Sequence, residues 1–197
     1  MNEEMRKALE ADGEKLRQLT YVMNNKRKIS AEGVRSSQGM ATLVRRWHTW
    51  PMLLPDTVGR HSCRAALIYM EIWGLPRAEV LAWLLMHDLG ELTAGDTPSS
   101  AKEWPPLKES LQAVESMGRL VCGVRIPELL DDEVNKCELV DKLEAWETAL
   151  IEHRMGNSYA ECVMEGLSVS IHDMLGEIAT DDEAAIVYAF MISTMGR

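Results

Sequence analysis

The sequence predicts an all-α protein, a bundle of roughly six to eight helices. Leu, Met, Ala and Glu, which favour helices, are plentiful along the 197 residues. Runs that alternate β-branched with polar residues, the usual pattern of strands, are missing, and Phe occurs only once. Hydrophobic residues make up 46% of the chain, so a bundle of this size buries a core and can hold a site between facing helices.

The N-terminal part of the chain predicts one long helix, followed by a short polar stretch and an apolar segment. A charged, amphipathic stretch is expected to form the first helix at about 2–25. The stretch 29–40 is small and polar, which indicates a loop or a short helix. An apolar segment at 40–50 follows, and Pro51 breaks it. We therefore divide the chain into an N-terminal helical extension and a single globular unit, 1–40 and 41–197.

Capping signals place the next two helices. Asp56 or Thr57 is expected to cap a helix that runs to about Trp73, where Gly74 ends it. The apolar pattern that follows a proline predicts one continuous helix over 77–92.

Gly and Pro residues mark a loop at 94–106, and the rest of the chain again predicts helices. Acidic residues open the third helix from the end, and the pair Thr180 and Glu183 fits a capping box for the last one. The expected helices are at about 107–122, 131–155, 158–178 and 182–195.

Charge is unevenly distributed along the chain. Lys and Arg total 21, Asp and Glu total 31, and the formal net charge is −10, which argues against a broad basic footprint for a nucleic acid polymer. Residues 1–50 nevertheless carry ten basic and six acidic side chains. This basic arm fits an anionic ligand, or it is simply a solvated basic face.

The sequence favours a cytoplasmic protein without a membrane anchor. The N-terminal residues lack the apolar core of a secretory signal, and no run reaches the roughly 18 apolar residues that a membrane span needs. No C-x-x-C pair occurs, and the cysteines stand apart in the sequence, as is typical of reduced thiols: Cys63, Cys122, Cys137 and Cys162.

Four side chains with metal-binding chemistry lie on the apolar sides of expected helices. His87 and Asp88 end an apolar helix, and an aspartate is costly to bury there unless it is paired or bound to a metal. His61 and Asp141 share faces with apolar neighbours. Such a mixed nitrogen and oxygen set suits Mn, Co, Zn or Fe better than Ca. Taken singly, each residue also fits a core histidine or a surface-paired aspartate.

The order of these residues resembles the metal signature of the HD-domain phosphohydrolases. A longer match over about 42–155 resembles the bacterial 5′-deoxynucleotidases of that superfamily and the phage dATP triphosphohydrolases. It consists of Arg46-Trp47, His61-Ser62 and then His87-Asp88-x-x-Glu91-x-x-x-Gly95-Asp96-x-Pro98-x-x-x-Lys102. The resemblance implies an all-α HD-domain bundle at 41–197, with 1–40 as an addition to the family core.

The resemblance implies a metal centre and its catalytic neighbours. One divalent ion, Mn, Co or Zn with Mg as a further possibility, would be held by His61, His87, Asp88 and Asp141. Glu91 would orient or deprotonate the attacking water. Asp96 would contact the substrate near the sugar and the reacting phosphate.

The resemblance also implies a substrate-binding set. Arg46 would pair with a phosphate, and Trp47 would pack on the deoxyribose and base, where a close fit excludes a 2′-hydroxyl. Pro98 would shape the base pocket, and Lys102 either reaches phosphate or is an ordinary exposed lysine. Arg60 stands where these enzymes carry an acidic residue, so it either adds positive charge for a longer polyphosphate or is a surface arginine.

These features predict a metal-dependent phosphohydrolase of 2′-deoxynucleotides that acts at the 5′-linked phosphorus. A dNMP would give deoxynucleoside and phosphate, and a dNTP such as dATP would give deoxynucleoside and triphosphate. The alternatives are an HD hydrolase of an alarmone or cyclic nucleotide and a non-catalytic nucleotide-binding module. The expected partner is a small-molecule deoxynucleotide, with no nucleic acid polymer and no membrane, and the family implies a homo-oligomer, a dimer or larger.

Overall fold

The computed structural model describes residues 31–47, 49–98, 102 and 104–196, and every regular element among them is helical. The predicted all-α bundle is thus confirmed, while the helix expected at 2–25 lies outside the described residues. The elements are α2 (Ala31–Ala41), α3 (Val58–Trp73), α4 (Ala78–Met86), the 3-10 turn η1 (His87–Gly90), α5 (Glu91–Ala94), α7 (Pro105–Val121), α8 (Asp131–Arg154), α9 (Tyr159–Ile178) and α10 (Asp181–Met195).

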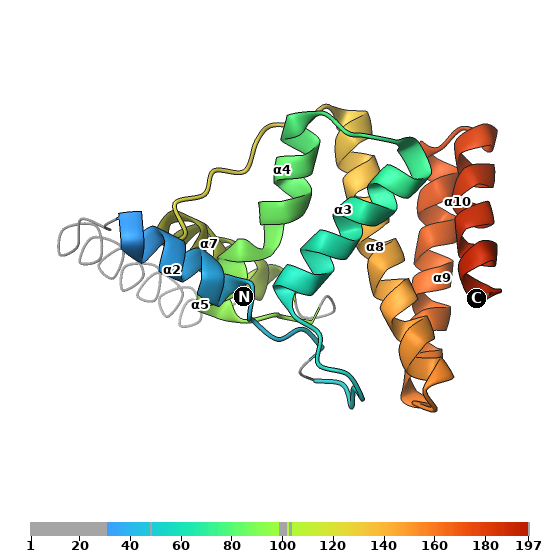
Figure 1. Ribbon diagram of the computed structural model, residues 1–197, viewed down its shortest axis with the longest axis horizontal. Coiled ribbons are helices and arrows are strands. Elements are labelled where there is room, and N and C mark those ends of the chain that lie inside the picture. The colour runs from blue at the N-terminus through green and yellow to red at the C-terminus, as the bar shows by residue number, and fades with distance from the viewer. Residues whose placement is uncertain (1–30, 48, 99–101, 103, 197) are drawn as a thin grey trace, which may run out of the picture.

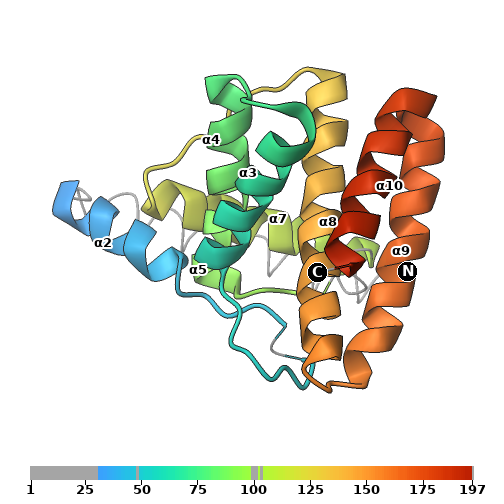
Figure 2. The ribbon, with the colours of Figure 1, turned by 45° about the vertical axis from the view of Figure 1, so that its right-hand side comes forward.

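The long helix α8 lies at the centre of the bundle. Helices α9 and α10 cover one side of it, and α3 and α4 pack on another (Figures 1 and 2). Helices α2, α5 and α7 gather at the far end, beside η1. A second, smaller apolar cluster joins these elements to α3 through buried side chains: Ala41, Val58, Leu89 and Cys122.

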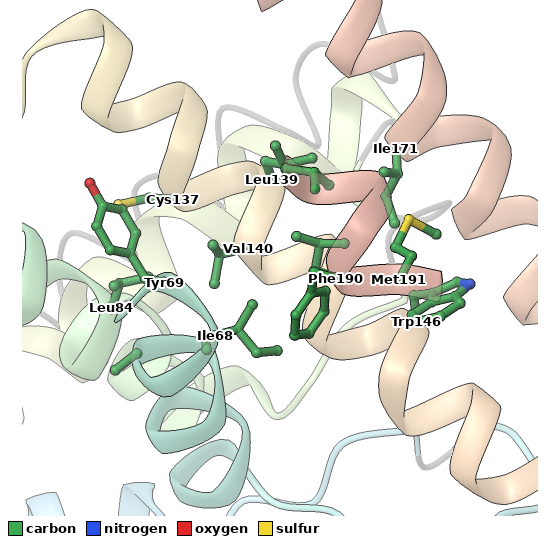
Figure 3. Packing of buried hydrophobic residues seen from close by; sticks show 14 of the residues in the cluster. Ile68, Tyr69, Leu84, Cys137, Leu139, Val140, Trp146, Ile171, Phe190 and Met191 are labelled. Atoms are coloured by element: carbon green, nitrogen blue, oxygen red, sulfur yellow. The ribbon is translucent and has the colours of Figure 1, made fainter. Parts of the chain in front are cut away.

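The main core is formed by apolar faces of α3, α4, α8, α9 and α10. Ile68, Val140 and Phe190 bring three of these helices together (Figure 3). Burying an apolar side chain of this size contributes about 1.5–3 kcal/mol to folding. Trp146 is also buried, and its indole nitrogen donates to the hydroxyl of Ser168 at 3.0 Å, so its polar atom remains satisfied.

Local signals placed most helix ends correctly. Thr57 caps α3 by accepting a hydrogen bond from the backbone nitrogen of Arg60, and Gly74 ends the helix with φ at 81°. Thr180 and Glu183 form the predicted capping box of α10. The segment expected as a loop or short helix at 29–40 contains α2, whose Gln38 donates to the carbonyl of Cys122 at 2.9 Å.

The continuous helix predicted over 77–92 is wrong. Helix α4 ends at Met86, η1 occupies the next four residues, and α5 starts at Glu91. The turn packs directly on α7: a Cβ at Gly90 would lie 2.5 Å from the carbonyl oxygen of Glu115, and one at Gly118 would overlap the carbonyl of Gly90. This tight approach accompanies the break that places the His-Asp pair and Glu91 on separate short elements.

The helices that the structure describes include none with the length and apolar character required to cross a membrane.

Candidate metal centre

A short antiparallel pairing brings the segment before α3 against the start of that helix. Arg45 and Thr57 form an isolated bridge. The backbone nitrogen of Arg46 donates to the backbone carbonyl of Asp56 at 3.1 Å, and the backbone nitrogen of Val58 donates to the backbone carbonyl of Val44 at 2.9 Å. These bonds place the side chains of Arg46 and Trp47 beside Asp56, at the start of α3.

The four side chains of the His/Asp set come together from three parts of the fold. His61 lies on α3, His87 and Asp88 lie on η1, and Asp141 lies on α8; one donor atom from each lies within 4.8 Å of the others. Nε2 of His61 is 2.8 Å from Oδ1 of Asp141. Nε2 of His87 is 3.3 Å from Oδ2 of Asp88.

The donor set fits a divalent metal ion. Nε2 of His61 and Nε2 of His87 are buried, and neither makes a hydrogen bond with good geometry to any described residue. Their Nδ1 atoms are occupied, by Glu144 at 2.6 Å and by the carbonyl of Leu84 at 3.2 Å. A carboxylate and a carbonyl only accept, so both Nδ1 atoms donate, and both Nε2 atoms face the cluster as the positions where a proton or a metal ion binds. Two imidazoles with two carboxylates suit Zn, Mn or Co.

The electrostatics of the cluster favour bound positive charge. Burial alone would lower the pKa of His61, but Asp141 and Glu144 outweigh it and raise the pKa to about 9. Burial is likewise outweighed at His87, whose pKa the charge of Asp88 raises to about 10. Protons and a metal cation therefore compete for the same nitrogens.

Glu91 is a buried carboxyl beside this cluster. It is 3% exposed, Oε1 lies 3.2 Å from Nζ of Lys102, and Oε2 is buried without a hydrogen bond to any described residue. Burial and then the charge of Asp88 raise the pKa of Glu91 to about 8, against the opposing effect of Lys102. A carboxyl with a pKa in this range is suited to accept a proton near neutral pH.

Arg46 and Trp47 are held by buried and half-buried carboxylates. Nη1 of Arg46 donates to Glu144 at 2.9 Å and to Asp56 at 3.3 Å. The indole nitrogen of Trp47 donates to Asp56 at 3.2 Å, and its backbone nitrogen donates to Asp96 at 2.9 Å. Trp47 has φ at 60°, a strained conformation for a bulky residue, and such strain persists where surrounding contacts enforce it.

Two other candidate residues are paired within the protein. Nη1 of Arg60 lies 2.9 Å from Asp56, so its charge is compensated by a carboxylate at the base of α3. Lys102 pairs with Glu91, and its Nζ also lies 3.8 Å from Glu115, so it is not an isolated exposed lysine. Pro98 is half-buried and accepts a hydrogen bond from the backbone nitrogen of Lys102 at 3.1 Å.

Comparison with known proteins identifies the fold. No family model and no curated protein matches the sequence. Among solved structures, the chain is similar to the cyanophage S-2L HD phosphohydrolase DatZ, bound to dA and one catalytic Zn²⁺ ion. The TM-score is 0.65 at 19% sequence identity, over 82% of this chain and 96% of that one. The chain has the HD-domain fold.

Within this HD fold, sequence reasoning missed the carboxylates that surround the cluster. Asp56 is 2% exposed and Glu144 is fully buried, and both bind residues of the site. Glu144 lies one helical turn after Asp141, and this spacing alone does not show that it is buried. Glu152 was missed as well: it accepts from the backbone nitrogens of Leu53 and Leu54, both at 2.8 Å, and so ties the segment after Trp47 to α8.

Proposed function

We propose that this HD-fold protein is a metal-dependent phosphohydrolase of 2′-deoxynucleotides. The observation that carries the proposal is the convergence of His61, His87, Asp88 and Asp141 within 4.8 Å, with the buried carboxyl of Glu91 beside them. The similarity to a protein named as an HD phosphohydrolase and bound to dA and zinc supports the same assignment. His61, His87, Asp88 and Asp141 would hold the cation.

The reaction is the displacement of the nucleoside 5′ oxygen from phosphorus by water. A bound divalent ion supplies Lewis acidity, which polarises the phosphoryl group and lowers the pKa of water. Glu91 accepts a proton from the attacking water, because its Oε2 is free of protein hydrogen bonds among the described residues and its pKa lies near neutrality. The forked guanidinium of Arg46 binds the phosphate oxygens.

Trp47 and Asp96 account for selection of the sugar. Asp96 holds the backbone nitrogen of Trp47 at 2.9 Å, and Asp56 holds its indole nitrogen at 3.2 Å, so the ring lies next to Arg46, whose Cζ is 5.7 Å from the ring centroid. An aromatic ring fixed in this way packs against a deoxyribose and leaves little room for a 2′-hydroxyl. Pro98, on the same loop as Asp96, contributes to the wall of the base pocket.

A specific observation favours a triphosphate over a monophosphate. An open groove of about 600 Å³ reaches His87 and is lined by Arg119 and Arg125 as well as Ser116. Two guanidinium groups that line the same groove as His87 offer positive charge for phosphates beyond the first. The substrate we favour is therefore a dNTP, which water would convert to deoxynucleoside and triphosphate, with a dNMP as the second candidate.

Self-association and location complete the proposal. Helix α10 exposes Tyr188, Ile192 and Met195 on one face, an apolar surface consistent with a dimer or larger homo-oligomer, which light scattering measures. We place the protein in the cytoplasm, where deoxynucleotides are available to it.

The deciding experiment is a substrate panel. The protein is loaded with Mn, Co or Zn and incubated with dNMPs, dNTPs, rNTPs, a cyclic nucleotide and an alarmone, and the products are separated. We expect hydrolysis of deoxynucleotides with release of triphosphate or phosphate. Glu91→Gln should retain the metal and lose nearly all turnover, while the exposed Glu109→Gln on α7 should be unaffected. Binding of nucleotides without turnover would favour a non-catalytic module, and preference for a cyclic nucleotide or an alarmone would overturn the proposal.

A further inference from the structure

One buried carboxylate oxygen is shared by the two halves of the site. Oε2 of Glu144 accepts from Nδ1 of His61 at 2.6 Å and from Nη1 of Arg46 at 2.9 Å. Oε1 of the same carboxylate accepts from the hydroxyl of Thr148 at 3.0 Å. Glu144 therefore touches a candidate metal ligand and a candidate phosphate ligand at a single atom.

The cost of burying Glu144 indicates that its charge has a specific role. Its side chain has no exposed surface, and an ionised carboxylate is expensive to bury unless it is paired and hydrogen-bonded. The hydrogen bond from Nδ1 of His61 and the ion pair with Arg46 supply this pairing. The group is thus an anion fully committed to three partners.

The contact to His61 fixes the orientation of that ring. Because a carboxylate cannot donate, Nδ1 must carry a proton, and Nε2, which faces Asp88 and Asp141, is the ring atom left to bind a metal ion. The distance from Nε2 to Oδ1 of Asp141, 2.8 Å, shows that the ring is already turned toward the other ligands.

The contact to Arg46 leaves most of its fork available. Among the described residues, the hydrogen bonds of this guanidinium use Nη1 alone, to Glu144 and to Asp56. The donors on Nε and Nη2 are left to bind two oxygens of an anion such as a phosphate. Glu144 thus binds the guanidinium through Nη1 and fixes the orientation of Nε and Nη2.

We propose that Glu144 is a positioning residue that couples metal binding to phosphate binding, by orienting His61 and Arg46 through one oxygen. The metal half of this inference, that Glu144 orients His61 for the metal ion, stands on the donor cluster alone. The phosphate half, that Glu144 orients Arg46 for phosphate, rests on the proposed function. Because both partners share the atom, weakening one contact disturbs the other.

Glu147, one turn further along α8, provides a matched control. It is a buried carboxylate that holds Arg64 by two hydrogen bonds, at 2.5 and 2.6 Å, from the same pair of helices, and none of its hydrogen bonds or ion pairs among the described residues involves a candidate metal ligand. A purely structural role for Glu144 would make Glu144→Gln and Glu147→Gln behave alike.

The first test is metal affinity, measured by chelator competition and by the ligand-field absorption of bound Co²⁺. We expect Glu144→Gln to weaken Co²⁺ and Zn²⁺ binding by about 10–100-fold, the usual effect of losing a group that orients a ligand. Glu147→Gln should stay within about twofold of the wild type by the same reasoning. Equal metal affinity of folded Glu144→Gln and wild type would overturn the metal half.

The second test is kinetic, at saturating metal. Glu144→Gln should raise KM for the substrate more than it lowers kcat, because the guanidinium of Arg46 is no longer held in the orientation that binds phosphate. An unchanged KM would overturn the phosphate half. Absence of turnover by the wild type on every nucleotide, with the metal affinities as expected, would instead overturn the proposed function and support the metal half.

A third measurement needs no variant and decides the case if Glu144→Gln fails to fold. The ¹⁵N chemical shifts of His61 in zinc-loaded wild-type protein should show a protonated Nδ1 and a metal-bound Nε2. The opposite arrangement would exclude Glu144 as the group that orients the ring.

Discussion

Nζ of Lys102 lies 3.2 Å from Oε1 of Glu91, so the loop after α5 places a cation directly on the candidate general base. The ammonium of Lys102 lowers the pKa of Glu91, whereas burial and the charge of Asp88 raise it. Lys102→Met should therefore raise the pKa of Glu91 further. Because the base must be deprotonated to act, the acidic limb of the kcat/KM profile should move to higher pH, with a greater loss of rate at pH 6 than at pH 9.

Lys102→Met also distinguishes two roles of Lys102. One is to lower the pKa of Glu91, and the other is the contact with phosphate that the family resemblance implies. If Lys102 binds phosphate instead, Lys102→Met should raise KM equally at every pH and leave the position of the limb unchanged. A pH–rate profile at saturating metal measures both quantities.

The close approach of η1 and α7 should make Gly118 sensitive to a single methyl group. A Cβ at this position would overlap the carbonyl of Gly90, so Gly118→Ala should cost roughly 1–3 kcal/mol of stability. Since η1 carries His87 and Asp88, metal affinity should fall as well. Gly176→Ala on α9 meets no atom within 4 Å and should be neutral or gain up to about 1 kcal/mol. Urea unfolding and metal titration compare the two.

The ion pair between Glu133 and Arg77, which lies outside the metal-binding cluster, should contribute to the pH dependence of the free energy of unfolding at acidic pH. The carboxylate of Glu133 accepts hydrogen bonds from Nε and Nη2 of Arg77 at 2.7 Å each and from the backbone nitrogen of Leu130 at 3.0 Å. These bonds lower the pKa of Glu133 to about 2. A folded pKa below the unfolded value of roughly 4.3 stabilises the protein above that pH and loses the effect as pH falls toward 2. Glu133→Gln should therefore be less stable than wild type at pH 7, with a gap that closes between pH 4 and 2 in urea titrations. A gap independent of pH would contradict this.

Trp47 should set the preference for deoxyribose. Trp47→Ala is expected to bring the rates for deoxyribo- and ribonucleotides closer together, because the ring that limits space at C2′ is lost. Trp47→Gly removes the same ring and also relieves the strain of a positive φ, which costs of order 1–3 kcal/mol. Both variants should show the same rate ratio while the glycine variant melts at the higher temperature. A ratio unchanged from the wild type would remove Trp47 from sugar selection.

Arg119 and Arg125 should matter more for a triphosphate than for a monophosphate. Nη2 of Arg119 donates to the hydroxyl of Ser116 at 3.1 Å, Nη1 lies 3.8 Å from Glu115, and the residue lines the same groove as His87. The double substitution Arg119→Ala/Arg125→Ala should raise KM for dNTP at least tenfold, a loss of about 1.4 kcal/mol, and leave KM for dNMP nearly unchanged. An equal effect on both substrates would place the distal phosphates elsewhere.

Which parts of the structure the sequence predicts depends on the range of the interactions that form them. The start of α3 at Thr57 and of α10 at Thr180 follow from residues within one turn, and both predictions are confirmed. The break after Met86 was missed because the contact that accompanies it joins Gly90 to Gly118, which lies 28 residues later in the sequence. No local pattern contains that information.

The candidate site divides in the same way. His61, His87, Asp88 and Asp141 were found by their order along the chain, and the fold places them together. Their roles stay predictions. The burial of Glu144 was not foreseeable, because its partners on α3 and on the preceding loop lie 83 and 98 residues earlier. The sequence shows only an acidic residue on a helix, which most often faces solvent.

Helix α8 places three parts of the site in a fixed relative register. Asp141 reaches the metal cluster, Glu144 joins His61 to Arg46, and Glu152 anchors the segment that follows Trp47. One residue inserted or deleted between positions 141 and 152 would rotate everything beyond it by about 100° and shift it by about 1.5 Å along the axis. Proteins that share this site should therefore vary in length before α8 or after it, and keep the interval from the metal ligand to the loop anchor constant.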